Sequence, residues 1–151
     1  MAFQTDVKSN QAFGVVGELY DTSIRRVTPY KLAAASTIGR PAWLTADGKA
    51  TGTFASGLKL IGIFVNPKEY THKGNVADVT LQMTADSIAQ VADLGHVNAI
   101  AGAAIKVGDT VYFNTTNNIF TTASEGGVAV GKCVRAGAVA GEVFVLQIAV
   151  A

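Results

Sequence analysis

The last third of the chain constrains the fold most strongly, because short apolar runs alternate there with turn-forming clusters. The runs are rich in β-branched and aromatic residues, and stretches of Gly, Asn, Thr and Ala separate them. Such runs are typical of β-strands, and their close spacing is typical of consecutive hairpins. Residues 107–150 therefore predict an antiparallel meander that has almost no reactive side chains and offers a surface for binding. Its expected strands cover residues 111–113, 119–122, 128–134 and 143–150.

The first two thirds of the chain follow this pattern less regularly. Asp47-Gly48 is a hairpin signal, because glycine tolerates positive φ, and Pro29 either ends one strand or marks it as an edge strand. Residues 31–35 are expected to form a single helical turn. Further strands are expected at residues 13–16, 22–28, 42–45, 50–54, 58–65 and 76–83. Residues 87–92 fit a strand or a short helix, of which we favour the strand, and residues 97–105 lead into the meander.

These elements indicate an all-β fold, either a small β-barrel or a jelly-roll-like β-sandwich of mostly antiparallel strands. Residues 1–12 are polar and have no clear period, so we expect an extended N-terminal arm there. Residues 13–151 are expected to form a single all-β domain, which is large enough to bury a hydrophobic core.

Low charge and high hydrophobicity favour assembly with other chains. Hydrophobic residues make up 49% of the 151 residues and charged residues only 15%, against a usual fraction of about a quarter. Contact with other chains is a natural place to bury the excess apolar surface. The net charge of +1 gives no sign of nucleic acid or an anionic membrane as a partner. No apolar run approaches the roughly 18 residues of a membrane span.

The few charges are unevenly placed. Residues 22–46 contain four basic side chains and no acid, whereas residues 74–105 contain three aspartates and no Lys or Arg. Two interpretations stay open: these are solvated loop faces, or they are complementary patches that set the register between neighbouring subunits. The basic residues are Arg25, Arg26, Lys31 and Arg40, and the acidic ones are Asp78, Asp86 and Asp93.

One motif resembles a nucleotide-binding loop but fails on inspection. Residues 126–132 match the spacing G-x-x-x-x-G-K, but Cys133 follows where Ser or Thr must hold magnesium. A phosphate loop also needs a strand before it and a helix after it, whereas residues 128–130 themselves have the character of a strand. We therefore expect no nucleotide cofactor.

Other reactive residues are also isolated in the sequence. His72 and His96 lie far apart with no further ligands at metal-binding spacing, and both are expected on the surface, in loops or at strand ends. Cys133 is expected to act as a small hydrophobic residue in a strand, and Asp109 as a turn residue that binds its own backbone. With no nucleophile elbow, the sequence predicts no catalytic residue, cofactor or metal site, and hence no enzyme.

The order of three segments resembles the phage structural cement family, the head decoration proteins. Residues 38–43 (IGRPAW), the Asp47-Gly48 turn and residues 60–65 (LIGIFV) follow one another as a Gly-Arg-x-Ala-Trp stretch, a short turn and a Gly-Phe/Ile-Val strand do in that family. The opening MAFQT and residues 14–17 (GVVG) are also similar to its N-terminus. The ending, VGDTVYF and residues 143–148, is similar to the closing strands of phage decoration modules more widely. The similarity covers most of the chain and is weakest at residues 66–92.

This resemblance implies a protein that binds the outside of an assembled capsid and bridges neighbouring major capsid subunits against the pressure of packaged DNA. The implied partners are the major capsid protein and the chain itself, as a homo-oligomer in which a dimer is favoured over a trimer. The implied location is the exterior of the virion capsid, after synthesis in the host cytoplasm. The first residues, which lack a basic and an apolar region, agree with the expectation of no secretory signal.

The expected contacts with the capsid or a sister subunit lie in two places. The arm, from residue 2 to residue 8, is expected to lie along a capsid subunit and to order on binding. Three arginines are expected to pair with acids on the lattice or on a sister subunit. The candidate contact residues are Ala2, Phe3, Gln4, Thr5, Arg25, Arg26 and Arg40.

The alternative function is a phage tail or adhesion module that binds carbohydrate. Exposed, stacked aromatic side chains in a groove would favour that class, whereas buried aromatic side chains favour a cement protein. We expect the aromatic residues of the strands to lie in the core. A platform for stacking bases would need Lys or Arg residues interleaved with them, and the sequence has none there. These aromatics are Trp43, Tyr112, Phe113, Phe120 and Phe144.

Overall fold

The computed structural model describes residues 16–20, 24–65, 82–135 and 138–149. Every regular element within these ranges is a β-strand, which confirms the predicted all-β class. The strands are β1 (Arg26–Lys31), β2 (Ser36–Thr37), β3 (Pro41–Leu44), β4 (Ala50–Thr51), β5 (Lys59–Val65), β6 (Gln82–Met83), β7 (Ile88–Ile100), β8 (Thr110–Asn114), β9 (Ile119–Thr121), β10 (Gly127–Arg135) and β11 (Val143–Ala149).

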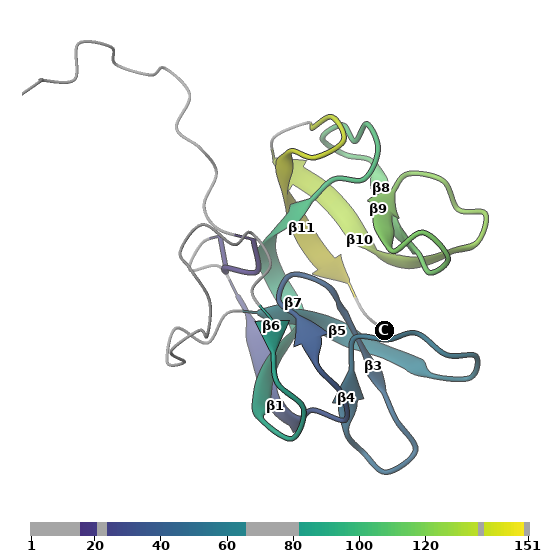
Figure 1. Cartoon of the computed structure of the whole chain (residues 1–151). Helices are drawn as coiled ribbons and strands as arrows, with labels where there is room; N and C mark the ends of the chain where they lie inside the picture. The colour runs from purple at the N-terminus through teal and green to yellow at the C-terminus, as the bar shows by residue number, and fades with distance from the viewer. Residues whose placement is uncertain (1–15, 21–23, 66–81, 136–137, 150–151) are drawn as a thin grey trace, which may run out of the picture.

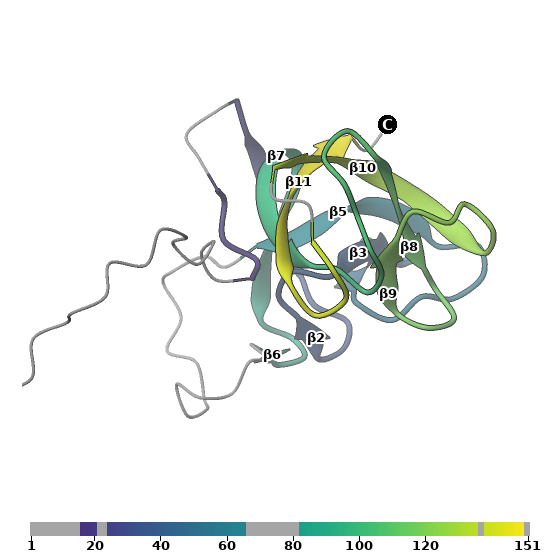
Figure 2. The same cartoon turned by 90° about the horizontal axis from the view of Figure 1, so that it is seen from above.

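Nine of these strands form one curled sheet (Figures 1 and 2). Its order is β4-β3-β5-β7-β11-β10-β8-β9, and β1 pairs with β7 off this path. All pairings between these strands are antiparallel. Strands β2 and β6 form a separate antiparallel pair. The predicted antiparallel arrangement is confirmed, in the form of a half-barrel.

Strand β7 belongs to both halves of the sheet. Its first part pairs with β1 and β5, so that Ala92 lies opposite both Val27 and Ile63. Its second part pairs with β11, where Val97 lies opposite Leu146. We call β1, β3, β4 and β5 the first half, and β8 to β11 the second half. The first half lies in the lower part of Figure 1 and the second half in the upper part.

Each half curls until its last strand meets the chain next to β7. In the first half, Leu32 just after β1 forms a parallel bridge with Ala50 of β4. In the second half, Ala101 just after β7 forms a parallel bridge with Phe120 of β9. Since a sheet that bends back on itself covers its own apolar face, both halves enclose side chains.

The enclosed side chains form two hydrophobic clusters. The larger cluster includes Phe113, Phe120 and Phe144 of the second half, and the smaller one includes Leu32 and Phe64 of the first half. Rings of Phe113 and Phe120 lie 5.1 Å apart, and those of Phe120 and Phe144 6.1 Å apart, both edge to face. Burying such a ring contributes about 1.5–3 kcal/mol. These rings and Trp43 are buried as expected, while Tyr112 is half-buried.

Two predictions for the first half were wrong. Residues 31–35 form no helical turn, because the Leu32 and Ala33 amides donate to the carbonyls of Ser87 and Ala50 across the sheet. The strand expected at residues 50–54 ends after Thr51. There the Gly52 amide donates to Ser36 Oγ instead of to a neighbouring strand.

Strand β7 confirms the strand favoured over a short helix at residues 87–92, and it continues into residues 97–100. The ladder with β11 continues through residues 94–96, and Gly95 adopts a φ of 132° that few other residues accept. His96 accordingly lies within a strand and not in a loop or at a strand end. Strand β1 continues through Pro29, which is compatible with its place at an edge. The strand expected at 13–16, most of that at 76–83 and the boundary at residue 12 lie outside the described residues.

Candidate functional site

The motifs considered in the sequence form neither a metal site nor a phosphate-binding loop in the described residues. None of them forms a group of three or more His, Cys, Asp or Glu side chains that could hold a metal ion. The loop-like motif at residues 126–132 runs into strand β10, where Gly131 packs against the Gln147 carbonyl. The described part of the chain also has no helix of the length and hydrophobicity that a membrane span requires.

Two isolated reactive residues have structural roles. Cys133 is buried in β10, and burial raises the pKa of its thiol, so that the reactive thiolate is disfavoured. Asp109 Oδ2 accepts a hydrogen bond from the Lys106 amide at 2.9 Å, which confirms the predicted turn. Neither residue therefore marks a catalytic site.

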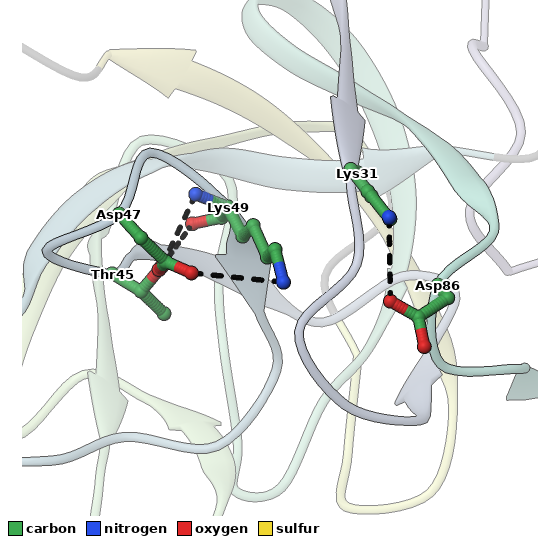
Figure 3. A network of polar contacts seen from close by, with 5 residues as sticks. All are labelled: Lys31, Thr45, Asp47, Lys49 and Asp86. Atoms are coloured by element: carbon green, nitrogen blue, oxygen red, sulfur yellow. Dashed lines mark hydrogen bonds and ion pairs between the residues drawn. The ribbon is translucent and has the colours of Figure 1, made fainter.

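The Asp47-Gly48 hairpin is confirmed and is held by side chains as well as by backbone (Figure 3). Thr45 Oγ1 accepts the Lys49 amide at 3.1 Å, and Lys49 Nζ lies 3.6 Å from Asp47 Oδ2. A hydrogen bond from the Thr45 hydroxyl is the main cause of the lowered pKa of Asp47. Gly48 has a φ of 78° in open space. This network stabilises a turn.

Basic and acidic segments pair within the chain where β1 meets β7. The Arg26 guanidinium binds the Asp93 carboxylate with two nitrogens, at 2.8 and 2.7 Å. This contact lowers the pKa of Asp93, mainly through the hydrogen bond. At the other end of β1, Lys31 Nζ lies 3.5 Å from Oδ1 of Asp86, which lies in the turn before β7 (Figure 3). At these positions the uneven charges pair within one chain.

Arg40 has different surroundings, between the two halves of the sheet. Its Nη1 donates to the carbonyl oxygen of Asn118 in the β8–β9 turn, and its guanidinium carbon lies 6.0 Å from the centre of the Phe113 ring. The side chain is half-buried, and burial lowers the pKa of the guanidinium. It lines a pocket of about 370 Å³ together with Ala35, Ser36, Thr37, Gly52, Thr53, Phe54, Phe113, Thr115 and Asn118.

Local structure fixes both walls of this Arg40 pocket. Gly39 adopts a φ of 82°, and its amide donates to the Phe64 carbonyl while the Phe64 amide donates to the Arg40 carbonyl, so this turn is fastened to β5. On the other wall, Asn114 Oδ1 accepts the amides of Thr116 and Asn117 at 2.9 and 3.0 Å. Asn118 then adopts a φ of 55°, a left-handed conformation that asparagine accepts more readily than most residues.

The structure separates the candidate contact residues. Arg25 is exposed just before β1, Arg26 is paired with Asp93, and Arg40 lies in the pocket before β3. The pocket walls at residues 52–54 and 115–118 were not predicted. In the sequence, only the Asn117-Asn118 pair indicates a turn in one of these walls. The two walls are far apart in sequence, so their contact depends on the fold. Ala2, Phe3, Gln4 and Thr5 lie outside the described residues.

Comparison with known proteins decides the family. A family model described as "Structural cement protein (E217 gp24/Pam3 gp6)" matches residues 3–149. The chain belongs to the phage structural cement proteins. This cement protein has the same fold as a chain of "The capsid of Myoviridae Phage XM1", with a TM-score of 0.69 and 21% sequence identity over 99% of this chain and 98% of that one. No curated protein matches the sequence.

Family membership confirms the resemblance read from the sequence. It indicates a structural role in the phage virion, a location at the capsid and association with capsid proteins. A family of structural phage proteins also suggests a non-enzymatic role, in line with the paired charges and buried thiol of this cement protein.

Proposed function

We propose that this cement protein binds the outer surface of the assembled capsid and bridges neighbouring major capsid subunits. The observation that carries the proposal is the family match, which extends over residues 3–149. A ligand that binds only the assembled shell stabilises that shell by mass action. Many copies on a repeating lattice add to this effect, because each bridging copy holds its second subunit at a high effective concentration.

The proposed contacts are the N-terminal arm and the three arginines. Residues 2–8 lie along a capsid subunit, and Arg25, Arg26 and Arg40 contact acids of the lattice or of a sister subunit. Arg40 has the best support, because no acidic side chain of the described residues pairs with it. Arg26 has the weakest support, because Asp93 already binds it.

The carbohydrate-binding alternative has less support from the aromatic side chains. Trp43, Phe113, Phe120 and Phe144 are all at most 3% exposed. Among the described residues, Phe54 is the most exposed aromatic, and Tyr20, Tyr30 and Tyr112 are half-buried without a ring contact to one another. Carbohydrate binding would favour exposed, stacked aromatic side chains, so these buried aromatic side chains favour the cement function.

The direct test uses empty shells assembled from the major capsid protein of the same phage. We expect the purified protein to sediment with the shells and to raise the temperature at which they break. A variant without residues 1–8 should keep the melting curve of the full chain and lose sedimentation. Full-length protein that neither binds the shells nor raises their melting temperature would refute the proposal, whereas full binding by the truncated variant would exclude only the arm.

The proposed oligomeric state is a dimer. Light scattering of the free protein should give twice the mass of 15.6 kDa. A mass equal to one or three chains would contradict the dimer and leave shell binding unaffected.

A further inference from the structure

Arg40 is a half-buried cation without an acidic partner among the described residues. A guanidinium carries five N–H donors, and the protein acceptor identified for them in the described part of the chain is the Asn118 carbonyl. The Phe113 ring face adds a weaker contact at 6.0 Å. The side chain is half-buried and lines an open pocket, so its other donors face solvent in the free protein, where an entering acceptor can replace water.

Two exposed cations of the same chain show the opposite arrangement. Arg26 and Lys31 keep 63% and 51% of their side-chain surface in water, yet each has an aspartate. A counter-ion matters more where water is excluded. Arg40 is thus a partly buried cation with no acid beside it, and its solvent-facing donors point to a bound state in which an acceptor enters the pocket.

We propose that the Arg40 pocket receives an aspartate or glutamate side chain of a neighbouring major capsid subunit. This inference rests on the proposed function, and names the contact through which one part of the cement protein grips the shell. A carboxylate matches the planar fork of the guanidinium with two parallel hydrogen bonds. The pocket volume of about 370 Å³ leaves ample room for one inserted side chain.

The lining of the pocket fits such a side chain. Phe54 and Phe113 supply apolar walls for the methylene carbons of the acid, and Thr53 and Thr115 supply hydroxyl groups. Ser36 is already engaged, since its Oγ donates to the Ala34 carbonyl and accepts the Gly52 amide. Its role is to shape the wall.

The acid is expected from another chain because many of the described acids have partners in their own chain. Three bind basic side chains, and two accept backbone amides of nearby turns. These acids are Asp47, Asp86, Asp93, Asp109 and Glu142.

The first experiment measures sedimentation with empty shells for charge variants of the pocket. We expect Arg40→Gln to weaken binding at least ten-fold and Arg40→Glu at least a hundred-fold, because a carboxylate would then meet a carboxylate. Lys59→Glu, an exposed charge change on β5, is the matched control and should change binding less than two-fold. The melting temperature of Arg40→Gln should stay within about 4 °C of the parent. A larger drop in melting temperature together with unchanged binding by the folded fraction would assign Arg40 a purely internal role and overturn the inference.

The second experiment identifies the partner. On shells decorated with Arg40→Lys, a carbodiimide should join the introduced amine to a carboxylate as an amide with loss of water. Mass spectrometry should then find a peptide of this chain linked to an acidic peptide of the major capsid protein. Changing that acid to Lys in the shell should restore binding of Arg40→Glu. A link to the same chain or to a second copy of it, or Arg40-dependent binding of carbohydrates on a glycan array, would overturn the inference.

The two proposals fail in different ways. If the parent protein does not bind shells, both fail. If the parent binds and Arg40→Glu binds equally well, the pocket inference fails while the cement function stands.

Discussion

The two halves of the sheet differ in how their side chains stabilise them. In the second half, the rings of Phe113, Phe120 and Phe144 pack edge to face in the core. The three ion pairs among the described residues lie instead within the first half or between β1 and either β7 or the turn before it. The second half is thus a scaffold built on an aromatic core, and the first half presents Arg40 and the family motif. This division is typical of proteins in which a rigid frame positions variable loops for binding.

The largest effect is expected in the core of the second half. Phe144→Ala removes a fully buried ring that packs against Phe120, and should lower the free energy of unfolding by about 3–5 kcal/mol. Tyr112→Phe, at a half-buried ring of the neighbouring strand β8, is the control and should cost less than about 1 kcal/mol. Equal denaturation midpoints for the two variants would show that the second half is not the scaffold.

A smaller effect is expected at the turn that presents Arg40. Gly39→Ala places a carbon 2.3 Å from Val16 Cγ1 at a φ of 82°, so strain and crowding should together cost about 2–4 kcal/mol. Gly57→Ala has a similar φ of 87° in open space, and should cost only about 1–2 kcal/mol. Urea unfolding of both variants separates crowding from backbone strain. If the two costs are equal, the contact between Gly39 and Val16 has no part in fixing the pocket.

The smallest effect is expected at the exposed ion pair between β1 and β7. Asp93→Asn removes the charge that binds Arg26, and should lower the melting temperature by roughly 1–3 °C at neutral pH. The pKa of Asp93 is lowered in the folded state, so its contribution is complete above the unfolded value of about 3.9 and is lost as the pH falls through the folded value. The two melting temperatures should therefore converge in acid. A difference that persists at low pH would assign the effect to packing.

The strands of the second half were predictable from sequence, and those of the first half only in part. Residues 128–134 and 143–150 are compact apolar runs bounded by turn-forming residues, and the observed strands β10 and β11 begin and end within one residue of them. In contrast, Leu32 and Gly52 bond to groups distant in sequence, such as Ser87 and Ser36. No local pattern encodes such contacts.

The sequence singled out Arg40 as a candidate contact residue, but it did not predict the pocket in which Arg40 lies. Arg40 stood out in the Gly-Arg motif, but its pocket needs the β8–β9 turn, 78 residues away along the chain. The sequence showed a basic and an acidic segment, and in the structure two ion pairs between these segments form within one chain. A charge pattern alone does not distinguish pairing within a chain from pairing between chains.

Strand β7 has a mechanical consequence. Because β7 pairs with strands of both halves, the halves cannot separate unless hydrogen bonds between β7 and its neighbours break. A force applied to one half is therefore transmitted through β7 to the other half. We therefore expect both halves to unfold together in one step, because opening either half breaks the pairing of β7.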